Sequence, residues 1–151
     1  MSERPAARAA RLPRVETLLQ ANARFYEVFQ ALDYPAMEAL WEKSERVFCV
    51  HPGWQALRGW HPVLDSWKRI IANTASISFT LTQVSAHVDG TVGIVTLYEH
   101  ISSRVGQERH SSGTVSTNLF AFDSDRGEWL IFHHHSAHVY APEEEEGALL
   151  N

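Results

Sequence analysis

The stretch from Ser76 to Ser103, SISFTLTQVSAHVDGTVGIVTLYEHISS, decides the fold. Its first half places apolar Ile77, Phe79 and Leu81 between polar residues, which is the period-two pattern of a strand with one buried face. Asp89-Gly90 is a dipeptide that favours a two-residue hairpin turn. The stretch therefore predicts two antiparallel strands, 76–88 and 91–103, joined by a tight turn.

The segments on either side of this hairpin extend the pattern. Downstream, turn-forming residues at 105–107 and 123–127 separate two more predicted strands, 109–122 and 128–138. Upstream, apolar residues recur at helical spacing in three segments, and one short apolar run predicts a buried strand. The expected helices cover 14–32, a segment starting at Pro35 and the segment 61–73; the short strand covers 47–50, and 51–60 is expected to be a loop.

Helices followed by an antiparallel meander indicate the α+β class, with the helices on one side of the sheet. Long strands of this kind twist and curl. Helices that lie across the curled face would leave a cone with an open mouth, and pockets form in such concave places. We therefore expect a cone-shaped, curved antiparallel sheet wrapped around three N-terminal helices, with a ligand pocket at its mouth.

Composition limits the classes of partner. The chain has 151 residues, 44% of them hydrophobic, and a formal net charge of −5. This length suits one domain, which we expect over 14–140, between a flexible basic arm at 1–13 and an acidic tail at 141–151. The negative charge argues against nucleic acid and anionic membranes as partners. Neither a membrane span nor a signal peptide is evident, so we expect a cytoplasmic protein. The lone cysteine, Cys49, lies in an apolar run typical of the core.

Three consecutive histidines, His133-His134-His135, end the last predicted strand. Alternate residues of a strand point to opposite faces. Regular alternation from Trp129 therefore places His133 and His135 on the pocket face, and it turns His134 and Ser136 toward the opposite face, where a dimer contact or a structural role is expected. Because an imidazole titrates near neutral pH, His133 and His135 are candidates for binding or acid–base chemistry.

Glu99 is the one acidic residue in the middle of a predicted sheet strand, and Asn118 lies on the next strand. The two side chains either form a buried structural pair, or they act as a general base and the amide that orients it. His51 ends the first strand, where the rim of a pocket is expected. The sequence thus predicts His135, Glu99 and His51 as catalytic residues. A metal site of His51, His133 and His135 is an alternative.

The loop 51–60 is dense in proline, glycine and tryptophan. Helical spacing explains Trp41 and Trp67 as core residues, whereas Trp54 and Trp60 are better candidates for contact with a ligand. Arg58 lies between them and would neutralise a carboxylate ligand, although an exposed loop arginine is the simpler interpretation. The predicted ligand-binding residues are therefore Trp54, Arg58, Trp60, Asn118 and His133.

The ordered set of motifs resembles the NTF2-like superfamily, in particular its SnoaL-like branch, over about 18–138. The resemblance implies a cone-shaped α+β barrel, a pocket between sheet and helices that Tyr26 would line, and a homodimer packed through the outer sheet face. It does not imply one chemistry, because this fold also serves as a plain binding or assembly module. The residues that carry it are Phe25-Tyr26, Asp33, Leu40-Trp41, Val47, His51-Pro52-Gly53-Trp54, Gly59, Val63, Ser66-Trp67, Ile70, Thr96, Glu99, Thr117-Asn118-Leu119-Phe120, Trp129 and His134-His135-Ser136.

Two functions of different classes remain open at this point. The first is a pocket that binds a small, largely apolar organic molecule and transfers a proton without a cofactor, as in isomerisation, dehydration or cyclisation. Steroid-type isomerisation is disfavoured, because the sequence offers no second carboxylate to pair with Glu99. The second function is a non-catalytic dimeric module for binding or assembly.

Overall fold

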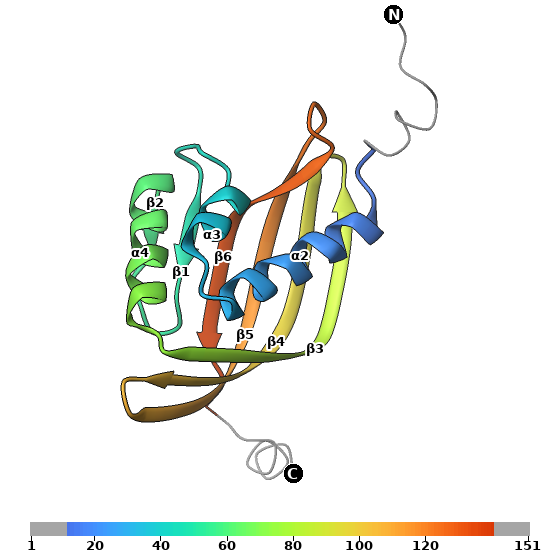
Figure 1. Cartoon of the computed structure of the whole chain (residues 1–151). Helices are drawn as coiled ribbons and strands as arrows, with labels where there is room; N and C mark the ends of the chain where they lie inside the picture. Colours follow the sequence, from blue (N-terminus) through green and yellow to red (C-terminus); the bar gives the residue numbers. More distant parts are fainter. Residues whose placement is uncertain (1–11, 141–151) are drawn as a thin grey trace, which may run out of the picture.

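The computed structural model describes residues 12–140. The predicted arm at 1–13 lies almost wholly outside these residues, and the predicted tail at 141–151 lies outside them completely. The described part forms three helices and six strands (Figure 1). The helices are α2 (Val15–Gln30), α3 (Tyr34–Leu40) and α4 (Trp60–Asn73); the strands are β1 (Phe48–Val50), β2 (Leu57–Arg58), β3 (Ser76–Asp89), β4 (Val92–Val105), β5 (Glu108–Asp123) and β6 (Glu128–His138).

The strands form one curved sheet in the order β2-β1-β6-β5-β4-β3. Helix α2 lies across the concave face of this sheet, and α3 and α4 lie beside it (Figure 1). The predicted α+β cone is therefore confirmed. Two details differ from the prediction. The sheet is mixed, because β1 runs parallel to β6, and the short strand β2 lies inside the segment predicted to be a loop.

Helix α2 places both apolar and polar residues on the face that it buries. Leu18, Phe25 and Phe29 form the apolar stripe, and Asn22 and Tyr26 lie buried along with them. The helix approaches the sheet so closely at Gly93 that a Cβ atom there would overlap the side chain of Leu18. Close packing of this kind fixes where the polar residues of α2 meet the sheet.

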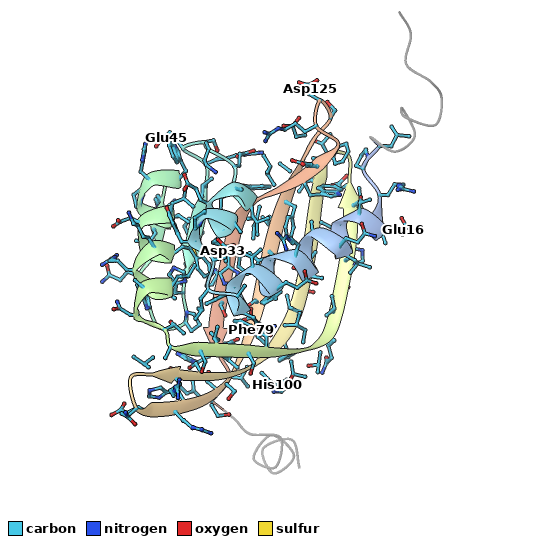
Figure 2. All side chains as sticks on the ribbon, viewed as in Figure 1. Glu16, Asp33, Glu45, Phe79, His100 and Asp125 are labelled. Carbon is cyan, nitrogen blue, oxygen red and sulfur yellow. The ribbon has the colours of Figure 1, made fainter. Side chains whose placement is uncertain are left out.

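Aromatic rings fill the space between helices and sheet (Figure 2). The ring of Phe25 lies edge-on to that of Trp67, with centroids 5.6 Å apart. Phe29 packs on Trp67 at 4.9 Å and on Phe79 at 5.0 Å. Trp41 and Trp67 are almost fully buried, as the helical spacing predicts. A packed aromatic centre therefore surrounds the buried polar groups.

A β-bulge changes which residues of β6 face the core. Leu119 of β5 pairs with His133, but Phe120 pairs with Ile131, so Phe132 is an extra residue in β6. Beyond the bulge the alternation is inverted, and His134 and Ser136 are buried. The prediction that His133 and His135 share the core face with Trp129 is therefore wrong, as is the prediction that His134 and Ser136 point outward.

Candidate functional site

The carboxylate of Glu99 lies at the centre of a cluster of hydroxyl groups. Glu99 is 3% exposed, on the concave side of β4. Its Oε2 accepts a hydrogen bond of 2.6 Å from the hydroxyl of Tyr26. Its Oε1 is contacted by hydroxyls of the neighbouring strand β5 and of β6, the strand beyond it. Those contacts are Thr114 at 2.6 Å, Ser136 at 2.9 Å and Ser116.

A chain of hydrogen bonds leads from this carboxylate to His134. The Tyr26 hydroxyl donates to Glu99 and accepts from the Asn118 Nδ2 at 3.1 Å. The same Nδ2 donates to Asn22 Oδ1 at 2.9 Å. Asn118 Oδ1 then lies 2.6 Å from Nδ1 of His134. Because this amide oxygen only accepts, His134 carries its proton on Nδ1 and leaves Nε2 as a free base.

The expected contact between Glu99 and Asn118 takes an indirect form. The two residues belong to adjacent strands, and the hydroxyl of Tyr26 bridges them. Helix α2 thus supplies the link between two positions that the sheet brings near each other. This arrangement gives Glu99, Tyr26 and Asn118 hydrogen-bond partners, as buried polar groups require.

The protonation states follow from burial and from these hydrogen bonds. Burial lowers the pKa of His134 to about 4, against the attraction of Glu99, so that this imidazole is neutral at pH 7. Burial alone would raise the pKa of Glu99, but the attraction of His134 and the hydroxyl donors outweigh it, and the net pKa lies below its usual value. Since His134 is uncharged at neutral pH, the hydroxyl groups keep Glu99 ionised there. Burial and the Glu99 charge raise the pKa of Tyr26 well above its usual value, so Tyr26 remains a donor.

His51 is a second buried, neutral imidazole near the first. The ring centroids of His51 and His134 are 6.5 Å apart. Nε2 of His51 lies 2.8 Å from the hydroxyl of Ser66, which donates its one hydrogen to the carbonyl of Val63. His51 therefore donates from Nε2 and leaves Nδ1 unprotonated. Burial lowers its pKa to about 3, with His134 and Arg69 adding to the effect.

Trp54 covers His51 from the solvent side. Its ring packs edge-on against the imidazole at 4.8 Å, while the side chain is 42% exposed. Trp60, the other loop candidate, is half-buried and packs on the neighbouring His61 at 3.6 Å. Only Trp54 of these two tryptophans makes a ring contact with the buried histidines in the described part of the chain.

The remaining predicted residues gather on the outer face of the sheet. Phe48 stacks on His133 with centroids 4.9 Å apart and lies 6.4 Å from His135. The guanidinium of Arg58 also lies over the ring of Phe48, at 5.0 Å from its centroid. The prediction that Arg58, His133 and His135 belong to the pocket with Glu99 is therefore wrong, and the sheet separates them from it.

This separation also rules out the three-histidine arrangement. His51 lies on the concave side of the sheet, and His133 and His135 lie on the outer side. Between residues 12 and 140, no group of three or more His, Cys, Asp or Glu side chains could hold a metal ion. Cys49 is buried, as expected, and burial raises the pKa of its thiol far above the usual value.

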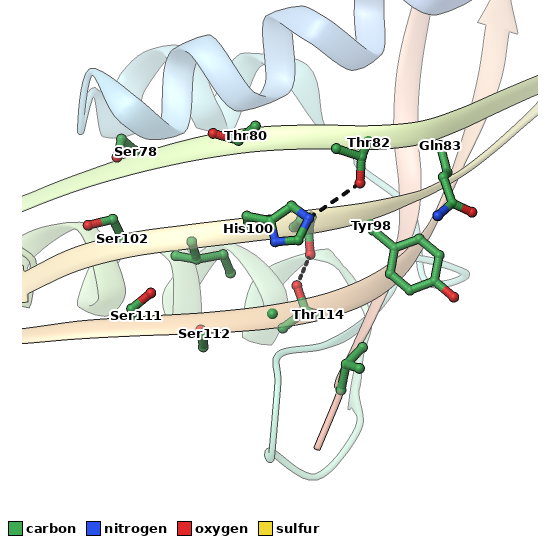
Figure 3. Close-up of a pocket in the computed structure, with 14 residues that line it drawn as sticks. Ser78, Thr80, Thr82, Gln83, Tyr98, His100, Ser102, Ser111, Ser112 and Thr114 are labelled. Carbon is green, nitrogen blue, oxygen red and sulfur yellow. Dashed lines mark hydrogen bonds between the residues drawn. The ribbon is translucent and has the colours of Figure 1, made fainter. Parts of the chain in front are cut away.

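Three hollows stand out on the described surface. One, of about 650 Å³, is lined by Glu99 and Thr114 together with residues of β3, β4 and β5 (Figure 3). A second hollow, of about 230 Å³, is lined by Ser76–Ser78 and by residues of β4 and β5. A third, of about 810 Å³, lies between α2, α3 and the β5–β6 turn. Neither His51 nor His134 lines any of these three.

Sequence reasoning missed several members of the polar cluster. Asn22 lies one turn before Tyr26 on the buried stripe of α2, and this spacing was the available signal. Thr114 and Ser116 precede the predicted Asn118 at alternate positions of β5, and Ser136 follows His134 by the same spacing. This period-two row of small polar residues on a buried face could have indicated a charged partner.

Comparison with known proteins agrees with this fold. The sequence model of the SnoaL-like domain family matches residues 18–141. The crystal structure of a candidate dehydratase of the NTF2-like family from Streptomyces avermitilis is 36% identical, with a TM-score of 0.78 over 84% of this chain and 96% of that one. The chain therefore belongs to the SnoaL-like family of the NTF2-like superfamily.

Two further relatives differ in what their names describe. A candidate calcium/calmodulin-dependent protein kinase type II association domain from Thiobacillus denitrificans is 23% identical, with a TM-score of 0.70 over 84% of this chain and 98% of that chain. The F-box protein SKIP8 of Arabidopsis thaliana is 24% identical over 120 residues, which are 80% of this chain. The chain spans about half (48%) of that curated relative.

Among the described residues, no helix combines the length and the hydropathy needed to span a bilayer.

Proposed function

We propose that this protein binds a small organic molecule and exchanges a proton with it at His134, in a reaction of the dehydratase, isomerase or cyclase type. The observation that carries the proposal is the orientation of His134. Its Nδ1–H is fixed on Asn118, and Nε2 is left as an unprotonated base that makes no hydrogen bond among residues 12–140. A neutral imidazole held in one tautomer is a common arrangement for general acid–base catalysis.

The rest of the polar cluster supports the same role. If Nε2 takes a proton from a substrate, the imidazolium that forms is stabilised by the negative charge of Glu99. Tyr26 and Asn118 transmit this polarisation through hydrogen bonds and hold His134 in place. The neutral His51, 6.5 Å away, is positioned to accept or return a second proton. In this scheme Tyr26 and Asn118 are positioning residues, and Glu99 acts through them.

In this scheme a ligand would reach the imidazoles past Trp54. This side chain is the exposed cover of His51, whereas Trp67 and Phe25 close the inner side. An aromatic surrounding of this kind favours a ligand with an apolar body and one ionisable C–H or O–H group. The similarity to the Streptomyces avermitilis protein, described as a candidate dehydratase, fits elimination of water from such a molecule.

The test is a screen for proton exchange at carbon. The protein is incubated in deuterium oxide with a panel of β-hydroxy ketones and β,γ-unsaturated ketones, and loss of the α-proton signal or formation of alkene is followed by NMR. We expect one class of compound to react with the wild-type protein and not with His134→Gln. The matched control is His135→Gln on the outer face, which should react like the wild type. Equal rates in all three proteins would contradict the proposal.

A second candidate function is assembly through the outer sheet face. Half-buried apolar side chains lie on adjacent strands there: Ile94 pairs with Leu119, and Leu119 pairs with His133, on which Phe48 stacks. We propose that the part of this face around Phe48 and Leu119 packs on a second copy of the chain to form a homodimer. Analytical ultracentrifugation should find a dimer for the wild type and a folded monomer for Leu119→Arg. A monomeric wild type at micromolar concentration would contradict it.

A further inference from the structure

A second place for a ligand lies on the outer face of the sheet, away from His51 and His134. It is the hollow of about 650 Å³ at the distal halves of β3, β4 and β5. Most of its lining comes from strand positions that alternate with the buried ones and so face away from the helices, and Glu99 and Thr114 add positions from the buried side (Figure 3). Its volume lies within the range of small-molecule sites, about 300 to 1,000 Å³.

The lining mixes hydroxyl groups with apolar surface, including Ile101 and Val139, and it is nearly free of charge. Seven of its side chains are Ser or Thr hydroxyls, and Gln83, Tyr98 and His100 add an amide, a phenol and an imidazole. Among the described residues that line it there is no Lys, Arg or Asp, and the carboxylate of Glu99 already accepts from its own hydroxyl donors. Such a surface does not offset the free-energy cost of removing an ion from water, but its hydroxyl groups can form hydrogen bonds with those of a neutral polar molecule. The seven hydroxyl residues are Ser78, Thr80, Thr82, Ser102, Ser111, Ser112 and Thr114.

The backbone is strained at one residue of this lining. Gln83 has a φ of 51°, in the left-handed region that glycine adopts without cost, and it lies at a break in register between Thr82 and Ser85. A non-glycine residue held there costs about 1 kcal/mol or more. Bulges commonly re-aim a side chain next to a binding site. Figure 3 shows Gln83 beside the ring of Tyr98, at one end of the row of hydroxyls.

An aromatic ring next to a row of hydroxyls defines the class of ligand. Tyr98 is 38% exposed, so one part of its ring is free to pack against the C–H face of a sugar ring. His100 is held by Thr82, whose hydroxyl lies 3.4 Å from its Nε2. We propose that this hollow binds a neutral polyhydroxylated molecule, such as a monosaccharide or a cyclic polyol, with Tyr98 as the stacking platform and Gln83 and His100 as hydrogen-bonding partners. This inference does not require the chemistry proposed at His134, although Glu99 and Thr114 belong both to the polar cluster and to this lining.

The test uses the full chain labelled with ¹⁵N and follows amide shifts in two-dimensional NMR spectra. The probes are the methyl glycosides of glucose, galactose and mannose, and myo-inositol; inorganic phosphate and cyclohexanol serve as charged and apolar counter-probes. At least one neutral polyol should give saturable shifts in 78–83, 98–102 and 111–114. Tyr98→Ala and Gln83→Gly should each weaken its affinity about fivefold to tenfold, the loss expected for one ring contact or hydrogen bond.

Gln83→Gly is the sharper variant, because glycine accepts the same backbone conformation and removes only the side chain. Thr96→Ala, on the same face of β4 but outside the hollow, is the control and should leave the affinity unchanged. The proposal is overturned if none of the polyols gives saturable shifts, if phosphate or cyclohexanol binds more tightly, or if Gln83→Gly and Tyr98→Ala bind the polyol as well as the wild type does.

Discussion

Replacement of Tyr26 by phenylalanine tests the polar cluster most specifically, because it removes one oxygen atom and keeps the ring. The hydroxyl makes two hydrogen bonds, a donation of 2.6 Å to Glu99 and an acceptance of 3.1 Å from Asn118. In the described part of the chain, the Tyr26 hydroxyl is the one donor to Glu99 Oε2, whereas Asn118 Nδ2 keeps its bond to Asn22. The variant thus leaves half of a buried carboxylate without a partner.

A hydrogen bond to a charged group contributes about 1.5 to 3 kcal/mol, and a buried group left unpaired costs a similar amount. We therefore expect Tyr26→Phe to lower the free energy of unfolding by about 2 to 3 kcal/mol. In urea this corresponds to a fall of about 0.7 to 3 M in the unfolding midpoint, for slopes of about 1 to 3 kcal/mol/M.

The assay is urea unfolding followed by tryptophan fluorescence and by circular dichroism. Tyr34→Phe is the matched control, because Tyr34 is half-buried on α3 and its hydroxyl makes no hydrogen bond among residues 12–140. The control should remain within about 0.5 kcal/mol of the wild type. A Tyr26→Phe variant as stable as Tyr34→Phe would refute the argument that the hydroxyl links Glu99 to Asn118.

Three further predictions concern other parts of the molecule. Gly93→Ala should lower the free energy of unfolding by about 1 to 3 kcal/mol, measured in urea, because its methyl group would overlap Leu18. The stability of the folded protein should fall as the pH drops from about 6.5 to 4, because over that window His134 binds a proton only in the unfolded chain. The pH dependence of thermal unfolding should therefore be shallower in His134→Gln than in the wild type. Equal slopes in the two proteins would argue against a depressed pKa of His134. The depressed pKa of Glu99 extends this loss below about 4.5. Cys49 should react with a thiol reagent only in urea, and rapid reaction of the native protein would show that it is accessible.

Much of the fold could be predicted because local patterns agree with the tertiary structure. The alternation at Ile77, Phe79 and Leu81 and the Asp89-Gly90 turn predict the β3–β4 hairpin, and Gly90 does adopt a positive φ of 61°. The helical stripe of α2 and the proline near the start of α3 predict those helices equally well. Each of these signals lies within a few residues, where sequence and structure are directly coupled.

The site was harder to predict, because one extra residue decides it. The bulge at Phe132 has no glycine or proline to mark it, yet it moves the core position from His135 to His134. A shift of one residue in a strand exchanges its two faces. Glu99, Asn118, Tyr26 and His51 could be selected by residue type and position. That the Tyr26 hydroxyl bridges Glu99 and Asn118 could not be predicted, because it depends on where α2 crosses the sheet.

The central claim is that His134 is a neutral base, held through Nδ1 by Asn118 and backed by Glu99. Long-range ¹H–¹⁵N NMR correlations of the histidine rings measure the tautomer and the protonation state directly. The account predicts that His134 has a protonated Nδ1 and an unprotonated Nε2 at pH 7 and does not titrate above about pH 5. A His134 ring that is protonated at pH 6, or that carries its proton on Nε2, would contradict it.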